Sequence, residues 1–491
     1  MVAKTFQGLE GVLADELTAL GADEVAQGVR MVSFRGDKRL MYKANFACRT
    51  ALSILKPFYK FRSDDVDDLY RRLLDYDWSR IMSVNQTFAI SVTASGNEFR
   101  NTQFVTYRVK DAIVDYFTSH GDKRPSIRVT NPDVRFDVHI AGTEVTLSLN
   151  SSGDPLYKRG WRVGQTDAPI NEVLAAGIVL LSGWRGESDL VDPMCGSGTF
   201  LVEAAMIATN TAPGVFRNDY AFQRWPDYDA DLYDEIYNDD SEEREFTHKI
   251  YGSDLSGKAI AIARANAKSA GMARHIELEL RDLTTIESAP QGCTVISNPP
   301  YGKRLGGDEN LQALYAAIGE RLKHVFKGCN AWLICIDDKE LVRHIGLKPS
   351  QRYPLLNGAI ECNLLHYVMF EGKYDEMRGR GETIRGGEFR ASDEHRGEHR
   401  RFREMRADRP RRDGDDRPRR EFNDRPRREF NDRPRREFND RPRRDSDSED
   451  RHSEEYARRV LRGREPQLGE DKTVPVMRER RRKPDGNNDN K

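Results

Sequence analysis

The sequence lacks the features of membrane-spanning, secreted and zinc-stabilised proteins. Its 491 residues contain no uninterrupted apolar run of the roughly 18–20 residues that a membrane span needs, and the longest candidate is the broken stretch 173–184. The N-terminus, MVAKTFQGLEG, has no apolar segment of a secretory signal. The six cysteines are scattered without a C-x-x-C pair or a histidine at ligand spacing, which favours reduced thiols. We therefore expect a cytoplasmic protein that needs neither a membrane nor a metal.

Net charge is also nearly absent, but the value of −1 conceals two unlike regions. Residues 371–491 hold 37 of the 79 Lys and Arg and 31 of the 80 Asp and Glu, so they carry +6 and the first 370 residues carry −7. The unit Asp-Arg-Pro-Arg-Arg recurs there from Asp408 to Asp440 with a period of eight. Because these repeats lack an apolar face that could stack, we expect residues 373–491 to form a disordered tail.

The first 370 residues contain enough apolar periodicity for three α/β regions. Helix and strand patterns alternate most regularly after residue 157, which predicts a parallel sheet covered by helices on both faces. The patterns predict helices at 8–21, 46–55, 69–74, 106–117, 198–208, 258–270 and 311–326. They predict strands at 29–34, 87–93, 126–130, two runs within 135–149 separated around Gly142, 190–193, 250–254, 276–280, 295–298, 331–336 and, at an edge, 364–370.

A glycine-rich turn follows the predicted strand at 190–193. The segment DPMCGSGT spans Asp192 to Thr199 and includes Cys195, Gly196 and Gly198. Glycines allow a tight turn and a close ligand approach, and the following helix presents free N–H groups. The third glycine of the dinucleotide fingerprint G-x-G-x-x-G is missing, and no G-K-[ST] of a P-loop occurs. Alone, the turn indicates a nucleotide site only weakly.

Acidic residues follow the next two predicted strands. Asp254, next to Leu255, could accept both ribose hydroxyls, or it could cap the helix at 258–270. Asp282, next to Leu283, could line the same edge, or it could be an ordinary surface residue. Because the carboxyl ends of parallel strands meet at one edge of a sheet, we expect these residues to lie near the glycine turn.

The most specific motif is Asn298-Pro299-Pro300-Tyr301, after the predicted strand at 295–298. Two prolines stop the strand and restrict the backbone, so an amide side chain and a main-chain carbonyl can point to one spot. Two acceptors suit an NH₂ group on a planar ring, and Tyr301 offers a face for stacking. The alternative is a simple proline turn.

Together these motifs resemble class I S-adenosylmethionine-dependent methyltransferases that act on an exocyclic amine. The order of further segments is similar to THUMP-domain RNA methyltransferases, and within them to bacterial large-subunit rRNA guanine-N2 methyltransferases. These segments are GLEGVLADEL at 8–17, NFACRTA at 45–51, LYKRGWR at 156–162, APINEVLAAGIVLLSGW at 168–184 and LLNGAIECNLLHY at 355–367.

The resemblance implies a ferredoxin-like segment (1–60), a THUMP RNA-binding domain (61–156) and a Rossmann-like methyltransferase domain (157–372), with methyl transfer from S-adenosylmethionine to N2 of a guanine in 23S rRNA. The cofactor set would comprise Asp192, Cys195, Gly196, Gly198, Thr199, Asp254, Leu255, Asp282 and Leu283. The catalytic set would comprise Asn298 and Pro299 on the target amine, Pro300, and Tyr301 on the base. The insertion at 210–247 has no assigned role.

Basic residues outside these motifs suggest where RNA could bind. Lys158, Arg159 and Arg162 form an aromatic-flanked cluster that is either an RNA contact or a solvated linker, and Lys303 with Arg304 could hold a phosphate. The tail is either RNA-binding or solubilising. We expect its deletion after Gly372 to leave the fold and turnover on naked RNA intact, and no second methyltransferase activity.

Two other functions fit part of the pattern. The substrate could be a tRNA guanine or an adenine N6 in nucleic acid, because the Asn-Pro-Pro-Tyr motif does not separate these amines. The protein could also be a non-enzymatic RNA-binding ribosome assembly factor, which would need neither Asp192 nor Gly196 nor Asp254.

Overall fold

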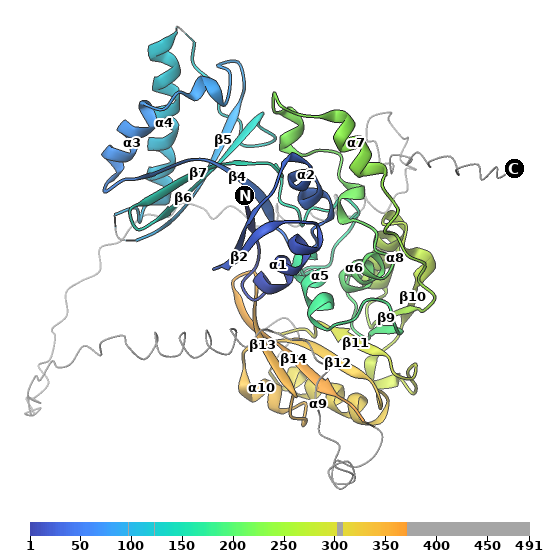
Figure 1. The fold of residues 1–491 in the computed structure, drawn as a ribbon. Coiled ribbons are helices and arrows are strands. Elements are labelled where there is room, and N and C mark those ends of the chain that lie inside the picture. Colours follow the sequence, from blue (N-terminus) through green and yellow to red (C-terminus); the bar gives the residue numbers. More distant parts are fainter. Residues whose placement is uncertain (97, 122, 302–307, 371–491) are drawn as a thin grey trace, which may run out of the picture. The chain divides into compact units, whose positions relative to one another are not determined.

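Two seven-stranded sheets organise the computed structural model, which describes residues 1–370 except 97, 122 and 302–307 (Figure 1). The first sheet has the order β2-β3-β1-β4-β7-β6-β5 and the second has the order β10-β9-β8-β11-β12-β14-β13. No described helix is long and apolar enough to cross a membrane. The predicted tail at 373–491 and the basic pair Lys303 and Arg304 lie outside the described residues.

The first sheet joins the two regions that the sequence pattern separates at residue 60. Strand β4 crosses that boundary and pairs antiparallel with β1 on one side and β7 on the other. One continuous sheet therefore connects the N-terminal segment to the region that follows it. Its elements are β1 (Val2–Lys4), α1 (Glu10–Ala19), β2 (Asp23–Gly28), β3 (Met31–Arg35), α2 (Lys38–Ala47), β4 (Ser53–Arg62), α3 (Val66–Leu74), β5 (Phe88–Ser95), α4 (Thr102–His120), β6 (Val134–Ala141) and β7 (Glu144–Asn150).

Two predictions for this region are wrong. The expected helix at 46–55 is divided between the end of α2 and the start of β4, and Pro57 lies inside the strand at a register shift. A bulge tolerates proline because no ladder hydrogen bond is needed from its nitrogen. The expected strand at 126–130 is reduced to one bridge between Phe88 and Ile127.

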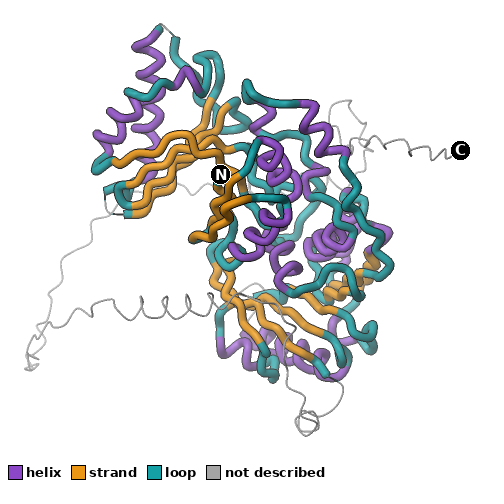
Figure 2. The backbone as a smooth tube through the Cα atoms, viewed as in Figure 1, coloured by secondary structure: helices purple, strands orange, loops and turns teal. Residues whose placement is uncertain are grey.

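The second sheet confirms the predicted Rossmann-like α/β architecture (Figure 2). Strands β10, β9, β8, β11 and β12 are parallel, and β14 is antiparallel between β12 and β13. The predicted strand at 364–370 lies largely in β14, but its predicted position at the edge is wrong, because β13 occupies the edge. The elements are α5 (Glu172–Leu181), β8 (Leu190–Asp192), α6 (Thr199–Ala208), α7 (Ala230–Asn238), β9 (Ile250–Asp254), α8 (Gly257–Ser269), β10 (Ile276–Leu280), β11 (Thr294–Ser297), α9 (Asp308–His324), β12 (Asn330–Ile336), α10 (Lys339–Arg343), β13 (Gln351–Asn357) and β14 (Ile360–Val368).

Both faces of this sheet are buried. Leu190 and Ile296 enter the core that contains α6, whereas their neighbours Val191 and Val295 enter the core that contains α9. Alternate side chains of a strand point to opposite faces, so helices cover both sides. The strand order reverses between β8 and β11, which is where open α/β sheets bind ligands outside the carboxyl ends of their strands.

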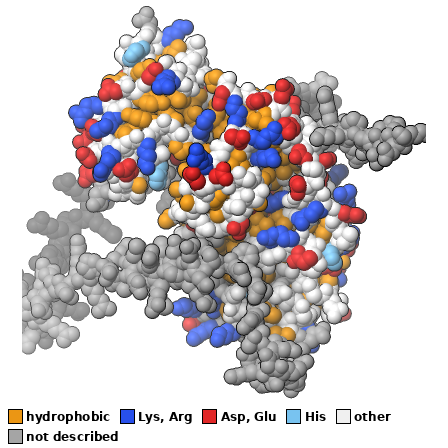
Figure 3. Space-filling view, in the orientation of Figure 1, with side chains coloured by type: hydrophobic (Ala, Val, Ile, Leu, Met, Phe, Trp, Pro, Cys, Tyr) orange, Lys and Arg blue, Asp and Glu red, His pale blue; other side chains and the backbone are white. Residues whose placement is uncertain are grey.

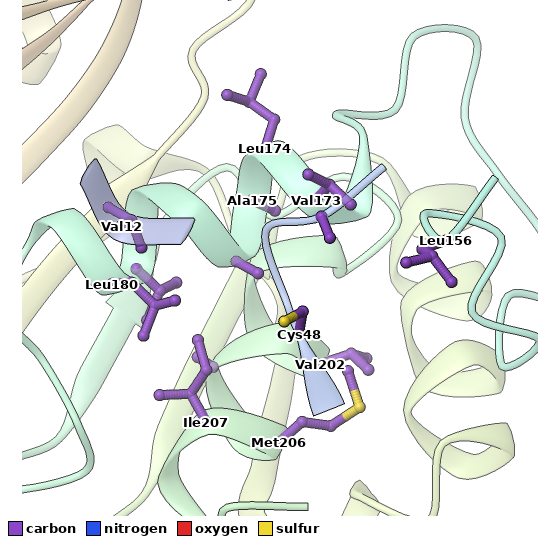
Figure 4. Close-up of a cluster of buried hydrophobic side chains, with 14 of the residues drawn as sticks. Val12, Cys48, Leu156, Val173, Leu174, Ala175, Leu180, Val202, Met206 and Ile207 are labelled. Atoms are coloured by element: carbon purple, nitrogen blue, oxygen red, sulfur yellow. The ribbon is translucent and has the colours of Figure 1, made fainter. Parts of the chain in front are cut away.

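Helix α5 is surrounded by protein on every side, in agreement with its almost entirely apolar sequence. Its residues from Glu172 to Leu180 are all buried. A Cβ atom at Gly177 would lie 2.5 Å from the Leu9 side chain, so glycine permits close packing near α1. Figure 4 shows side chains of α1, α5 and α6 gathered in one cluster. The apolar stretch 173–184 thus contributes to a core shared by the N-terminal segment and the second sheet.

The insertion at 210–247 packs on α2 through aromatic rings. Phe222 stacks on Tyr42 with ring centroids 4.3 Å apart, and on Tyr220 at 5.1 Å. Tyr233 of α7 meets the edge of Tyr42 at 6.2 Å. Aromatic pairs of this kind add stability beyond their buried area. The insertion therefore stabilises the contact between the N-terminal segment and the domain that contains the second sheet.

Candidate cofactor and target-amine site

Hydrogen bonds connect the ends of three parallel strands at the point where the strand order reverses. The Gly196 N–H donates to Asp254 Oδ2 at 2.9 Å, which joins the turn after β8 to the end of β9. The Ser297 hydroxyl donates to Asp192 Oδ1 at 2.7 Å, which joins β11 to the end of β8. The glycine turn, the first acidic residue and the start of the Asn-Pro-Pro-Tyr motif therefore form one bonded unit, as their strand positions predict.

The two glycines of the turn have different surroundings. Gly196 has φ of +54°, and beyond its chain neighbours a Cβ atom there would meet, within the described part of the chain, only the Thr166 hydroxyl, at 3.8 Å. Its open side permits the close approach of a ligand. Gly198 has φ of +77°, but a Cβ atom there would lie 3.0 Å from the Ala263 Cβ on α8. Gly198 is therefore required at least for the packing of two helices, whatever it contributes to ligand binding.

Asp192 lies behind the turn rather than on its surface. Its side chain is 1% exposed, and Oδ1 accepts hydrogen bonds from Ser297 and the Met194 N–H. Burial raises the pKa of this carboxyl to about 7, and the neighbouring charge of Asp254 acts in the same direction. The sequence predicts that Asp192 contacts the cofactor directly. The structure corrects this, because the buried carboxyl accepts hydrogen bonds that support the turn from the protein interior.

Asp254 does not cap α8, because Ser256 holds that position and accepts a hydrogen bond from Ala259 N–H. The Asp254 oxygens accept from the N–H groups of Gly196 and Ser256. A carboxylate oxygen has two acceptor positions, so both oxygens retain capacity for ribose hydroxyls. Next to it, Leu255 is 73% exposed and offers an apolar surface, and its contact with the cofactor stays a prediction.

The Asp282–Leu283 pair lies just beyond β10. The Thr284 N–H and hydroxyl donate to Asp282 Oδ1, and these bonds lower the pKa of the carboxyl. Leu283 is buried. The ionised Asp282 caps a short 3₁₀ turn at Leu283–Thr285, so a local structural role is evident, and contact with adenine stays a prediction.

Asn298 contains the most informative polar atom of the site. Its Oδ1 is buried and has no hydrogen-bond partner among the residues that the structure describes. Leaving a buried acceptor unpaired costs about 1–3 kcal/mol, so such an atom is expected to find a donor when the site is filled. The adjacent Pro299 is buried and Pro300 is exposed. Asn298 thus offers an acceptor that no donor from the described part of the chain occupies.

Tyr301 is held by the edge of the sheet. The Asn357 side chain of β13 donates to the Tyr301 hydroxyl at 2.5 Å. Burial raises the pKa of this phenol to about 12, so the ring is neutral at physiological pH. A neutral, anchored ring is suited to stacking on a base, and that contact stays a prediction.

The three residues of the basic cluster, Lys158, Arg159 and Arg162, have different surroundings in the structure. Lys158 is exposed and forms an ion pair with Asp154 at 3.0 Å, so its RNA contact stays a prediction. Arg159 is 2% exposed and donates to Glu203 and to the carbonyls of Leu156 and Arg49. The expectation that Arg159 contacts RNA is corrected, because its guanidinium is enclosed by protein acceptors.

Arg162 is also turned inward. It donates to Ser197 and Thr199 of the glycine turn and to Glu172 of α5. Thr199 itself is 1% exposed, so the expected cofactor contact by its side chain is corrected to a bond with Arg162. Cys195 is buried beside the turn, and burial raises the pKa of its thiol.

Sequence reasoning missed Asn266. This residue of α8 is 0% exposed, and its amide donates to the carbonyls of Ser197 and Gly164 at 2.9 Å. Its Oδ1 accepts from the N–H groups of Val163 and Gly164. The available signal was a single amide in the alanine-rich segment 259–270, which is typical of a buried polar residue with several partners.

The geometry fits an adenosyl cofactor: an open glycine, a carboxylate with spare acceptor positions and an exposed leucine line one edge. Among the residues that the structure describes, no group of three or more His, Cys, Asp or Glu could hold a metal ion. The sheet order, the glycine turn and the acidic strand end define the fold and site of a class I methyltransferase.

Comparisons with known proteins narrow this class. Residues 1–55 match the RlmL ferredoxin-like domain, 63–150 the THUMP domain and 159–366 the RMKL-like methyltransferase domain. The chain is 36% identical over 370 residues to slr0064 of Synechocystis, named as an RNA methyltransferase, covering 75% of this chain and 96% of that protein. The chain belongs to this family of THUMP-containing methyltransferases.

Two further relatives add detail. The ribosomal RNA large subunit methyltransferase K/L of Syntrophotalea carbinolica is 38% identical over 381 residues, covering 75% of this chain but 53% of that protein. The chain thus spans about half the length of the K/L relatives. The crystal structure of the methyltransferase SMU.472 complexed with SAH has a TM-score of 0.68 and 29% identity, covering 76% of this chain and 98% of that one.

Proposed function

We propose that this protein transfers a methyl group from S-adenosylmethionine to the exocyclic N2 of a guanine in large-subunit ribosomal RNA. The observation that supports it most is the buried, unpaired Oδ1 of Asn298, directly after the Ser297–Asp192 bond that joins β11 to the glycine turn. An acceptor without a protein donor at this position suits an incoming amine. The K/L relative and the SAH-bound neighbour support the substrate class and the cofactor.

The chemistry required of the chain is mainly positioning. Bound S-adenosylmethionine supplies a methyl group on a sulfonium, which is already a good leaving group. Asn298 Oδ1 and the Pro299 carbonyl accept the two amine hydrogens and hold the nitrogen lone pair toward the methyl carbon. Positioning of this kind can contribute roughly 7–11 kcal/mol to catalysis. Tyr301, whose hydroxyl accepts a hydrogen bond from Asn357 of β13, supports the base.

The target base must reach this acceptor as a single nucleotide. A guanine inside a helix is not accessible to a side chain at a sheet edge, so a flipped or looped base is the expected substrate. On the face shown in Figure 3, basic and acidic side chains are interspersed over the described surface. RNA contact is therefore expected in patches, with the THUMP domain providing one of them.

A tRNA guanine and an adenine N6 remain the competing substrates, because Asn298 would accept hydrogens from either amine. The test compares ribosomal RNA and tRNA from a strain that lacks the gene, before and after incubation with the purified chain and S-adenosylmethionine. Mass spectrometry of the nucleosides should show N2-methylguanosine gained only in large-subunit RNA. Methyl groups on adenine or tRNA would assign the competing substrate, and no transfer to any RNA would overturn methyltransferase activity.

A further inference from the structure

Arg162 donates to three acceptors, at the start of α5, in the glycine turn and at the start of α6. Its Nε donates to Glu172 Oε1 at 2.5 Å, Nη1 to the Ser197 hydroxyl at 3.1 Å and Nη2 to the Thr199 hydroxyl at 2.9 Å. The Arg162 and Glu172 side chains are 16% and 8% exposed. The planar guanidinium distributes its donors in fixed directions, so a single side chain sets the distance between the start of α5 and the glycine turn.

The same segment is attached a second time by Asn266 of α8. This amide bonds the backbone of Val163 and Gly164 and also the Ser197 carbonyl. Ser197 is therefore held through its hydroxyl by Arg162 and through its carbonyl by Asn266. The hydroxyl and the carbonyl of Ser197, the residue between the two glycines of the turn, therefore both have protein partners.

The segment also borders the open side of the turn. Apart from the chain neighbours of Gly196, the Thr166 hydroxyl is the one group of the described residues within 4 Å of the position that a Cβ of Gly196 would occupy. The segment 162–166 thus contacts the glycine turn at two places. Arg162 bonds Ser197 and Thr199 at one end, and Thr166 lies near the open side of Gly196 at the other.

We propose that Arg162 is a positioning residue for the cofactor: its bonds to Ser197, Thr199 and Glu172 hold the glycine turn in its binding geometry. This inference rests on the proposed function, since it requires that the turn binds S-adenosylmethionine. Arg162 acts through the turn and does not contact RNA, because Glu172 neutralises its charge and the two hydroxyls occupy its remaining nitrogens. The sequence suggests an RNA contact for Arg162, whereas this inference gives it a role in positioning the cofactor-binding turn.

The test measures SAH (S-adenosylhomocysteine) binding by isothermal titration, and RNA binding by filter retention, for the full chain and its variants. Loss of charge-assisted hydrogen bonds predicts a Kd for SAH that rises about 10–100-fold in Arg162→Ala. Arg162→Lys keeps the charge but lacks the planar guanidinium with its several donors. Its Kd for SAH should therefore lie between those of Arg162→Ala and wild type. RNA affinity should stay unchanged. Arg343→Ala removes an exposed arginine paired only with Glu340, and serves as the matched control.

Two features separate positioning from general destabilisation. Titrations are performed well below the thermal midpoint of each variant, and the binding stoichiometry reports the folded fraction. If Arg162→Ala does not fold, Glu172→Gln keeps the size of the side chain, weakens the same anchor and should still raise the Kd for SAH several-fold.

The outcomes are distinct. Equal SAH affinity in wild type and the variants overturns the role of Arg162 alone, and weaker RNA binding at unchanged SAH affinity returns the residue to RNA contact. Absence of SAH binding in wild type overturns the proposed function, and this inference with it.

Discussion

Asp192 and Asn298 stand at the carboxyl ends of neighbouring parallel strands, yet the protein treats their side chains in opposite ways. Asp192 is enclosed and accepts hydrogen bonds from Ser297 and Met194. Asn298 Oδ1 is buried, and no donor of the described residues reaches it. An acceptor satisfied by the protein stabilises the turn, whereas an acceptor left for the substrate is available for chemistry.

Asn298→Ala should lower kcat by about 10²–10³-fold, the usual cost of removing one preorganised polar group from a reacting centre. The Kd for SAH should not change, because Asn298 is expected to contact the amine and not the cofactor. Single-turnover methylation of RNA and titration with SAH measure the two quantities separately. Undiminished methyl transfer in this variant would contradict the proposed role.

Asp192→Asn should change how stability depends on pH. The folded-state pKa of about 7 exceeds the unfolded value, so the wild-type carboxyl stabilises the fold below pH 4 and this contribution is lost as pH rises to 7. The amide has no such loss. The difference in free energy of unfolding, variant minus wild type, should therefore grow by about 2–4 kcal/mol between pH 4 and pH 8.

Urea unfolding of both proteins at several pH values measures this difference, and contributions from other titrating groups cancel in the comparison. A difference that is independent of pH would show that Asp192 is ionised in the folded protein throughout.

At the scale of elements, the contact between α6 and α8 depends on Gly198. Gly198→Ala combines the cost of a left-handed backbone, about 1–2 kcal/mol, with about 1–3 kcal/mol from a Cβ forced against Ala263. Gly271→Ala is the matched control, because it has φ of +65° but nothing within 4 Å of the added carbon. Urea unfolding should find Gly198→Ala less stable than the control, and equal losses would refute a packing role.

The elements also show where sequence patterns are sufficient. Strands β9 and β10 have the predicted limits, Ile250–Asp254 and Ile276–Leu280, because short apolar runs with clear boundaries identify buried parallel strands. The run at 46–55 has no decisive period, and pairing with β1 and β7 makes its second half a strand. The edge position was assigned wrongly at 364–370 because strand order is a long-range property.

At the scale of the molecule, both sheets are built from residues between Val2 and Val368, and the charged repeats after Gly372 lack an apolar face that could join a core. A chain ending at Gly372 should therefore keep the thermal midpoint of the full protein, its Kd for SAH and its turnover on naked RNA. Differential scanning calorimetry and titration make the comparison. Loss of soluble expression or of SAH binding on truncation would assign a structural role to residues 373–491.

The sequence by itself determined the class of sheet, the family and the local motifs, because a glycine turn, an acid after a strand and Asn-Pro-Pro-Tyr are defined by neighbouring residues. The tertiary structure decided which charged side chains are exposed at the surface and which are paired inside the protein. Arg159 and Arg162 look alike in a basic segment, but their partners lie up to 110 residues away, at Arg49, Glu203, Ser197 and Thr199. Burial and pairing of a charge depend on such distant residues, so only the fold could show that these arginines face the protein rather than RNA.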